Sequence, residues 1–135
     1  METRRQHYKS FTHPSGTVFW FGAYLALVAV LLFTVPGLFL SVLQLPPPSD
    51  PWIRVLAVPV FNFGVMYTAM ARWAPSAVLR MTAVTRSWVI VAFGLLVVLD
   101  LAPPIVLLFA VVDLAGALWT FWALQREKAT APASA

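Results

Sequence analysis

The sequence predicts an all-α protein, a bundle of four antiparallel transmembrane helices over residues 17–125 with both termini in the cytoplasm. The first observation is composition: 61% of the 135 residues are hydrophobic and only 10% are charged, whereas soluble domains carry about 25% charged residues. The second is four apolar runs long enough to cross about 30 Å of hydrocarbon. The third is that Lys and Arg gather on one side of these runs.

Net charge and cysteine content exclude several functional classes. The chain carries a net charge of +4 and no cysteine. Without thiols, it has no disulfide, thiolate metal site or thiol redox chemistry of its own. In a membrane protein, Lys and Arg serve orientation and contact with anionic lipid head groups, so we assign no nucleic-acid partner. The partners we expect are the lipid bilayer and either further copies of the chain or a larger membrane complex.

The first span is predicted over residues 17–43, after a polar cytoplasmic arm over residues 1–16. Its start is rich in aromatic side chains, as at a membrane interface. Pro36 and Gly37 near its far end predict a kink, which membrane helices tolerate where neighbours satisfy the freed carbonyl group. The run is too long for a signal-peptide core, so we expect it to be a span.

A proline-rich linker, residues 45–51, leads to the second span over residues 52–72. Its consecutive prolines favour an extended polyproline conformation, which makes the linker a stiff hairpin connection. Asp50 is the expected N-cap of the next helix and Pro51 its first residue. Asn62 lies ten residues into this span, about 15 Å deep at helical rise and close to the midplane.

The remaining two spans form a second hairpin. The sequence at residues 73–76 breaks the preceding helix, and the membrane part of the third span is predicted over residues 83–101. Consecutive prolines then permit an immediate turn into the fourth span, residues 105–124. Residues 126–135 read as a disordered tail because they are polar and rich in small residues.

The distribution of basic residues fixes the predicted orientation. Only Arg54 lies on the side with the proline-rich linker, together with Asp50 and Asp100. The positive-inside rule therefore places both termini and the middle loop in the cytoplasm, and we expect a multi-pass protein of the inner (cytoplasmic) membrane. The basic residues on the predicted inner side are Arg4, Arg5, Lys9, Arg72, Arg80, Arg86, Arg126 and Lys128.

Asp113 is the main candidate site residue because it lies in the middle of the fourth span. A carboxyl group there costs at least about 2.5 kcal/mol on insertion scales, so it should face polar neighbours and not lipid. Counted from the outer face, Asn62 and Asp113 match in depth within about 3 Å. Tyr67 lies further along the second span and extends this polar line. Either Asp113 is protonated and only joins helices through hydrogen bonds, or these residues form a midplane proton or ligand site.

Two further groups of charged residues are candidates. Asp100 and Arg54 both lie just inside the outer boundary, where an ion pair would join the second and third spans; the alternative for Asp100 is a solvated carboxylate near the turn. Arg72, Arg80 and Arg86 form a cytoplasmic basic cluster. Their placement is explained by orientation and phospholipid contact, and the sharper alternative is a pocket for an anionic lipid.

Two stretches of the sequence form a pattern. One is the segment from Gly64 to Arg72. The other begins with a basic residue that opens the third span, Arg86, and continues through a short proline turn to an acid in the fourth span, Asp113 followed by Leu114. This pattern resembles a large set of small, uncharacterised bacterial proteins with four spans, loosely like the DoxX group. The resemblance implies a four-helix bundle. Some DoxX-type proteins are linked to quinone or sulfur redox chemistry, which would reach this chain by analogy alone.

Two functional hypotheses follow. The first is a non-enzymatic membrane component, such as an accessory or assembly subunit or a lipid-binding protein, in which Asp113 and Asn62 are packed away from any cavity. The second is a small proton-coupled transporter, channel or quinone-type redox protein with a cavity at Asp113, Asn62 and Tyr67. We assign no catalytic residue, no cofactor and no metal site, because the sequence lacks a nucleophile triad, a phosphate-binding glycine loop and a metal-ligand spacing.

Overall fold

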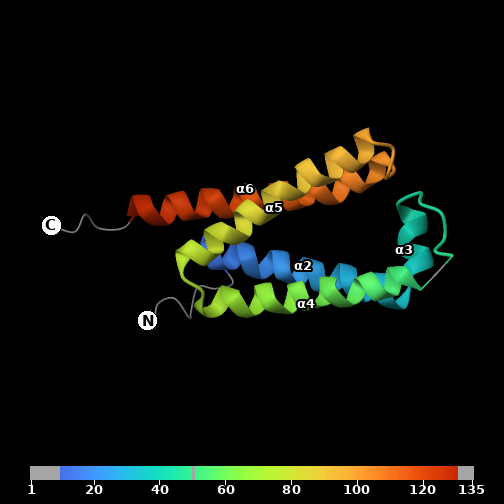
Figure 1. Ribbon diagram of the computed structural model, residues 1–135. Coiled ribbons are helices and arrows are strands. Elements are labelled where there is room, and N and C mark those ends of the chain that lie inside the picture. The colour runs from blue at the N-terminus through green and yellow to red at the C-terminus, as the bar shows by residue number, and fades with distance from the viewer. Residues whose placement is uncertain (1–9, 50, 131–135) are drawn as a thin grey trace.

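The computed structural model describes residues 10–49 and 51–130, and these residues form helices and connecting turns (Figure 1). Four helices are long and apolar enough to cross a membrane, which confirms the predicted all-α transmembrane architecture. The expected N-cap Asp50 lies outside the described residues, as do residues 1–9 and 131–135. In chain order the elements are α2 (Pro14–Thr34), α3 (Pro36–Val42), α4 (Trp52–Trp73), α5 (Ser76–Val98), the 3₁₀ turn η1 (Pro104–Val106) and α6 (Leu107–Thr130).

The four long helices form two hairpins. Helix α2 packs along α4, and α5 packs along α6. The two hairpins meet at one end of the molecule (Figure 1). We call this end, which holds the start of α2 and the end of α6, the terminal end. The opposite end, with α3 and the turn between α5 and α6, is the loop end.

Prolines set the breaks between helices. The residue before a proline is sterically disfavoured in the helical conformation. Val35 before Pro36 ends α2, with φ −132° and ψ 53°. Ala74 before Pro75 is extended, with φ −69° and ψ 139°. At Val35 the structure therefore divides the predicted first span into α2 and the short α3.

Glycines let α2 and α4 approach closely. A Cβ atom built on Gly64 would lie 2.7 Å from the backbone nitrogen of Ala26, and one built on Gly22 would lie 2.8 Å from the carbonyl oxygen of Gly64. Real Cβ atoms do not reach such distances, so only glycine fits at this crossing. Small residues at helix interfaces are typical of membrane proteins, where close packing replaces the hydrophobic effect.

Helix α6 extends to Thr130, whereas the sequence predicts a disordered tail from residue 126. The residues of this last turn are good helix formers, and the guanidinium carbon of Arg126 lies 4.5 Å from the centroid of a Trp122 ring. The Thr130 hydroxyl donates to the carbonyl of Arg126 at 3.0 Å. Composition alone missed these local interactions.

Small residues are prominent at the helix contacts, beside a few buried larger ones such as Val18 and Leu79, and most large hydrophobic side chains lie on the outside. Ala29, Ala57, Ala83, Ala110 and Ala117 are fully buried at the helix contacts. Large apolar side chains on all four long helices point outward, and Val98 is 79% exposed. Such a surface is suited to hydrocarbon, in agreement with the four spans.

Candidate functional site: a cleft with a buried arginine

Arg86 on α5 is the most deeply buried charged residue that the structure describes, with 3% of its surface exposed. Its Nη2 donates to the Thr120 hydroxyl on α6 at 2.7 Å, and its Nε donates to the Thr82 carbonyl at 3.2 Å. Its guanidinium carbon lies 4.3 Å from the centroid of the Phe21 ring on α2. Arg86 thereby joins three helices through one side chain.

The neighbours of Arg86 are themselves tied together. The Thr120 hydroxyl lies 2.8 Å from the Thr17 hydroxyl, which links α6 to the start of α2. A Cβ atom on Gly116 would lie 2.9 Å from Nη1 of Arg86, so the absence of a side chain there makes room for the guanidinium. Nη1 itself is buried and has no hydrogen-bond partner among the described residues. The guanidinium therefore has unused hydrogen-bonding capacity inside the protein.

Arg86 differs from its predicted role as a head-group contact. The sequence places it with Arg72 and Arg80 in a cytoplasmic basic cluster, as a head-group contact or part of a pocket for an anionic lipid, whereas the structure buries its side chain in the bundle. The reason is that Thr82 and Ala83, four and three residues earlier, make this side of α5 small enough to pack against α6. Arg72 and Arg80 are exposed near the terminal end, where contact with lipid head groups stays a prediction.

Asp113 on α6 is half-buried and lies one turn from Gly116 toward the loop end. It interacts electrostatically with Arg86, but in the described part of the chain no hydrogen bond or ion pair joins the two side chains directly. Ala110 and Ala117 on α6 are fully buried. An acid and a base thus lie close together within the membrane-spanning region.

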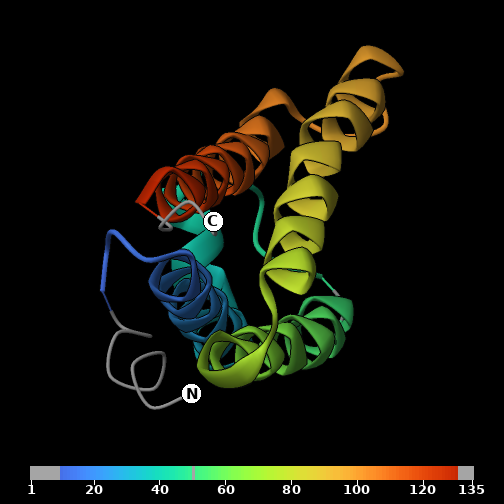
Figure 2. The ribbon, with the colours of Figure 1, turned by 90° about the vertical axis from the view of Figure 1, so that its left-hand side faces the viewer.

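Arg86 and Asp113 both line a cleft of about 710 Å³. Helices α4 and α5 form its two walls, and they diverge away from their short connection, as Figure 2 shows. The outer rim carries exposed residues such as Phe63 on α4 and Met81 on α5, so the cleft opens at the outer surface of the helices. The lining residues are Phe21, Leu25, Val60, Phe63, Met66, Tyr67, Met70, Val78, Met81, Thr82, Thr85, Arg86, Val89, Phe93 and Asp113.

Tyr67 and Asn62 have different positions relative to this cleft. Tyr67 lines it and packs against Phe21, with ring centroids 5.8 Å apart. Asn62 is exposed and is not among the residues that line the cleft with Asp113. A separation of five residues turns a helix by about 140°, so Asn62 and Tyr67 lie on different sides of α4. Asn62 and Asp113 therefore match in predicted depth, but Asn62 does not point into the cleft that Asp113 lines.

Arg54 and Asp100 lie on elements that separate at the loop end. The Nε of Arg54 donates to the carbonyl of Phe33 on α2 at 3.0 Å, across the tight hairpin. Asp100 is exposed in the turn after α5, with φ 55°. The structure records no pairing of the two side chains, because α5 diverges from α4 toward this end (Figure 2).

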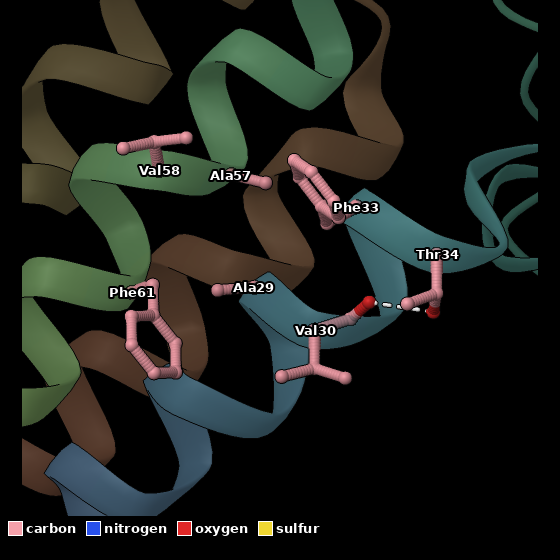
Figure 3. A pocket seen from close by; sticks show the side chains of 7 residues that line it. All are labelled: Ala29, Val30, Phe33, Thr34, Ala57, Val58 and Phe61. Carbon is pink, nitrogen blue, oxygen red and sulfur yellow. Dashed lines mark hydrogen bonds between the residues drawn. The ribbon is translucent and has the colours of Figure 1, made fainter.

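A second pocket, near the loop end between α2 and α4, offers a useful contrast (Figure 3). It has a volume of about 270 Å³ and no ionisable side chain in its lining. Its single hydroxyl, on Thr34, donates to the carbonyl of Val30 at 2.7 Å and is thereby occupied within its own helix. This apolar groove is lined by Ala29, Val30, Phe33, Thr34, Ala57, Val58 and Phe61.

The chemistry available in the cleft is binding by hydrogen bonds, charge and apolar contact. Within residues 10–49 and 51–130, no three His, Asp or Glu side chains converge as metal ligands. The sequence indicated Asp113 and Tyr67 as site residues. It did not indicate Phe21, which reads as an interfacial aromatic residue, or the contact between Arg86 and Thr120. No family model, curated protein or solved structure matches the chain.

Proposed function

We propose that this small multi-pass membrane protein is a non-enzymatic lipid-binding component that holds the hydrocarbon chain of a membrane amphiphile between α4 and α5. The observation that carries the proposal is the cleft of about 710 Å³, with apolar walls, an opening at the outer surface of the helices and charged residues in its lining. Ligand pockets generally have 300–1,000 Å³ and mostly apolar walls with a few polar groups.

Charge makes this cleft more than a packing gap. Ionisable residues in membrane spans are costly and usually mark a functional site or a polar partner. Asp113 lines the cleft, which departs from the expectation that a purely structural acid is packed out of reach. The apolar groove on α2 and α4 lacks any such group and needs only lipid tails to fill it.

The positive-inside rule supports an orientation for this protein. At the terminal end, the described basic residues include Arg72, Arg80 and Lys128, whereas Arg54 is at the loop end. We propose on this basis that the terminal end is cytoplasmic and that the protein resides in the inner membrane.

Photo-crosslinking tests the proposed function. The protein is reconstituted in nanodiscs with a small fraction of phosphatidylcholine and diacylglycerol whose acyl chains carry a diazirine, and labelled peptides are mapped by mass spectrometry. We expect one of these probes to label Val60 and Phe93 inside the cleft. Val89→Trp, which narrows the cleft from α5, should reduce this labelling at least fivefold, and Val60→Trp provides a second narrowing variant from α4.

The control variant is Val58→Trp in the apolar groove, which should leave labelling of the cleft unchanged. Thermal unfolding in detergent verifies that each variant folds. Equal labelling of the cleft in the parent protein and in both folded narrowing variants would overturn the proposed function.

Proton flux separates lipid binding from the transport and redox alternative. Vesicles containing the protein should acidify no faster than empty vesicles under an imposed gradient. A flux that Asp113→Asn abolishes would contradict the proposal and favour a proton-coupled function.

A further inference from the structure

We infer that the polar group of the bound amphiphile is an uncharged hydroxyl that donates a hydrogen bond to Asp113. The inference rests on the proposed function and identifies the ligand class of the same cleft. It predicts a long-chain alcohol or a diacylglycerol as ligand, and disfavours a phosphate-bearing or an amine-bearing lipid with the same chains.

Asp113 is more accessible from the cleft than Arg86. Arg86 also lines the cleft, but it is only 3% exposed and its Nη1 is buried beside Gly116, so little of the guanidinium is open to a ligand. Asp113 is half-buried and lines the cleft. A carboxylate only accepts hydrogen bonds, so the complementary ligand group is a donor. Tyr67 lines the same cleft and adds a phenolic hydroxyl, which both donates and accepts.

Charge balance in the cleft also favours a neutral ligand group. An arginine is permanently charged, so Arg86 and an ionised Asp113 together are neutral. At low dielectric, a phosphate placed beside Asp113 would be repelled by the carboxylate it contacts first, and an ammonium would add a second positive charge beside Arg86. A hydroxyl satisfies the carboxylate and leaves the net charge at zero.

The depth of Asp113 in the bilayer also favours a small uncharged group. Asp113 lies nine residues after Pro104, which is about 14 Å along the helix from the loop end and close to the middle of a 30 Å hydrocarbon layer. Large charged head groups remain at the bilayer surface. A single hydroxyl on a long chain, or the small head of a diacylglycerol, reaches this depth at a much smaller desolvation penalty.

Head-group competition tests the inference. The probe is a diazirine-bearing diacylglycerol that labels the cleft, and the competitors are diacylglycerol, phosphatidic acid with identical chains, a long-chain alcohol and the amine of equal length. We expect diacylglycerol and the alcohol to compete at least tenfold better than phosphatidic acid and the amine. Comparison of diacylglycerol with the alcohol distinguishes a two-chain ligand from a one-chain ligand.

Asp113→Asn provides a charge switch with nearly unchanged side-chain volume. It leaves the charge of Arg86 unbalanced, so phosphatidic acid should gain at least tenfold over diacylglycerol relative to the parent protein. Asp100→Asn, an exposed acid outside the cleft, is the matched control and should change neither preference. Thermal unfolding checks the fold, and a folded Asp113→Asn protein with the parent preference would contradict the inference.

The outcomes also separate the inference from the proposed function. If narrowing variants reduce chain labelling but all head groups compete equally, the cleft binds chains and the hydroxyl assignment is wrong. If phosphatidic acid competes best in the parent protein, the assignment is also wrong. If the narrowing variants do not reduce the labelling of the cleft by any acyl-chain probe, both proposals fail.

Discussion

The two helices of each hairpin are joined by different kinds of contact in the two hairpins. Helices α2 and α4 share a long interface, and their backbones approach each other closely at Gly22 and Gly64. Helices α5 and α6 meet through small side chains and through the hydrogen bond from Arg86 to Thr120. Backbone packing therefore dominates the contact between α2 and α4, whereas a polar side-chain contact joins α5 to α6, and a cleft lies between α4 and α5.

Removing the side chain of Arg86 should have the largest effect on the free energy of unfolding. Arg86→Met removes the hydrogen bonds to Thr120 and Thr82 and leaves Asp113 without its nearby positive charge. We expect a loss of about 3–5 kcal/mol in the free energy of unfolding, because hydrogen bonds to charged groups contribute roughly 1.5–3 kcal/mol each and Arg86 makes two. Unfolding in detergent measures it, and Arg80→Met, at an exposed position, should change the stability by less than about 0.5 kcal/mol.

A substitution at the glycine crossing tests the first hairpin by itself. Gly64→Ala places a Cβ 2.7 Å from the backbone of Ala26 and forces α2 and α4 apart, so we expect a loss of about 1–3 kcal/mol. The control is Gly94→Ala on α5, where a Cβ meets nothing within 4 Å. The control should be neutral or more stable, because alanine favours helix over glycine. Similar losses in both variants would show that close packing is not special to α2 and α4.

Thr120→Val tests the hydroxyl at which α6 contacts both α5 and α2. It keeps the side-chain shape but removes the acceptor of Arg86 and the contact with the Thr17 hydroxyl. We expect a loss of about 1 kcal/mol in the free energy of unfolding, because hydrogen bonds between membrane helices are individually modest. The measurement is unfolding in detergent, and Thr130→Val near the end of α6 is the control. A loss equal to that of Arg86→Met would assign the whole effect of the arginine to these hydroxyl contacts.

The smallest effect is expected at the loop end. Arg54 contacts the carbonyl of Phe33 and not Asp100. A double-mutant cycle with Arg54→Gln and Asp100→Asn should therefore give additive changes within about 0.3–0.5 kcal/mol. A larger coupling energy would favour the candidate ion pair over the solvated carboxylate and would bring the two hairpins together at this end.

The spans could be predicted from the sequence because hydropathy, proline and helix length act locally. Pro36 and Pro75 break helices where the sequence indicates a kink and a turn. The site was only partly predictable, because depth follows from residue counts whereas direction depends on which helices become neighbours. Asn62 and Asp113 match in depth, yet Asn62 is exposed and Asp113 lines the cleft with Tyr67.

Arg86 illustrates the same limit for charge. The positive-inside rule counts residues at helix ends, so it treats Arg86 like the exposed Arg72 and Arg80. Burial of Arg86 depends on Thr120, on a helix made later, and on Phe21, on one made earlier. Only the tertiary arrangement brings these groups to one place.

The hydrogen bond between Arg86 and Thr120 has a consequence for biosynthesis. Its acceptor is made 34 residues after its donor. Until α6 is synthesised, α5 carries near the start of its predicted span an arginine without this acceptor, and a charged side chain inside a membrane helix is costly. The two helices should thus leave the insertion machinery as one unit.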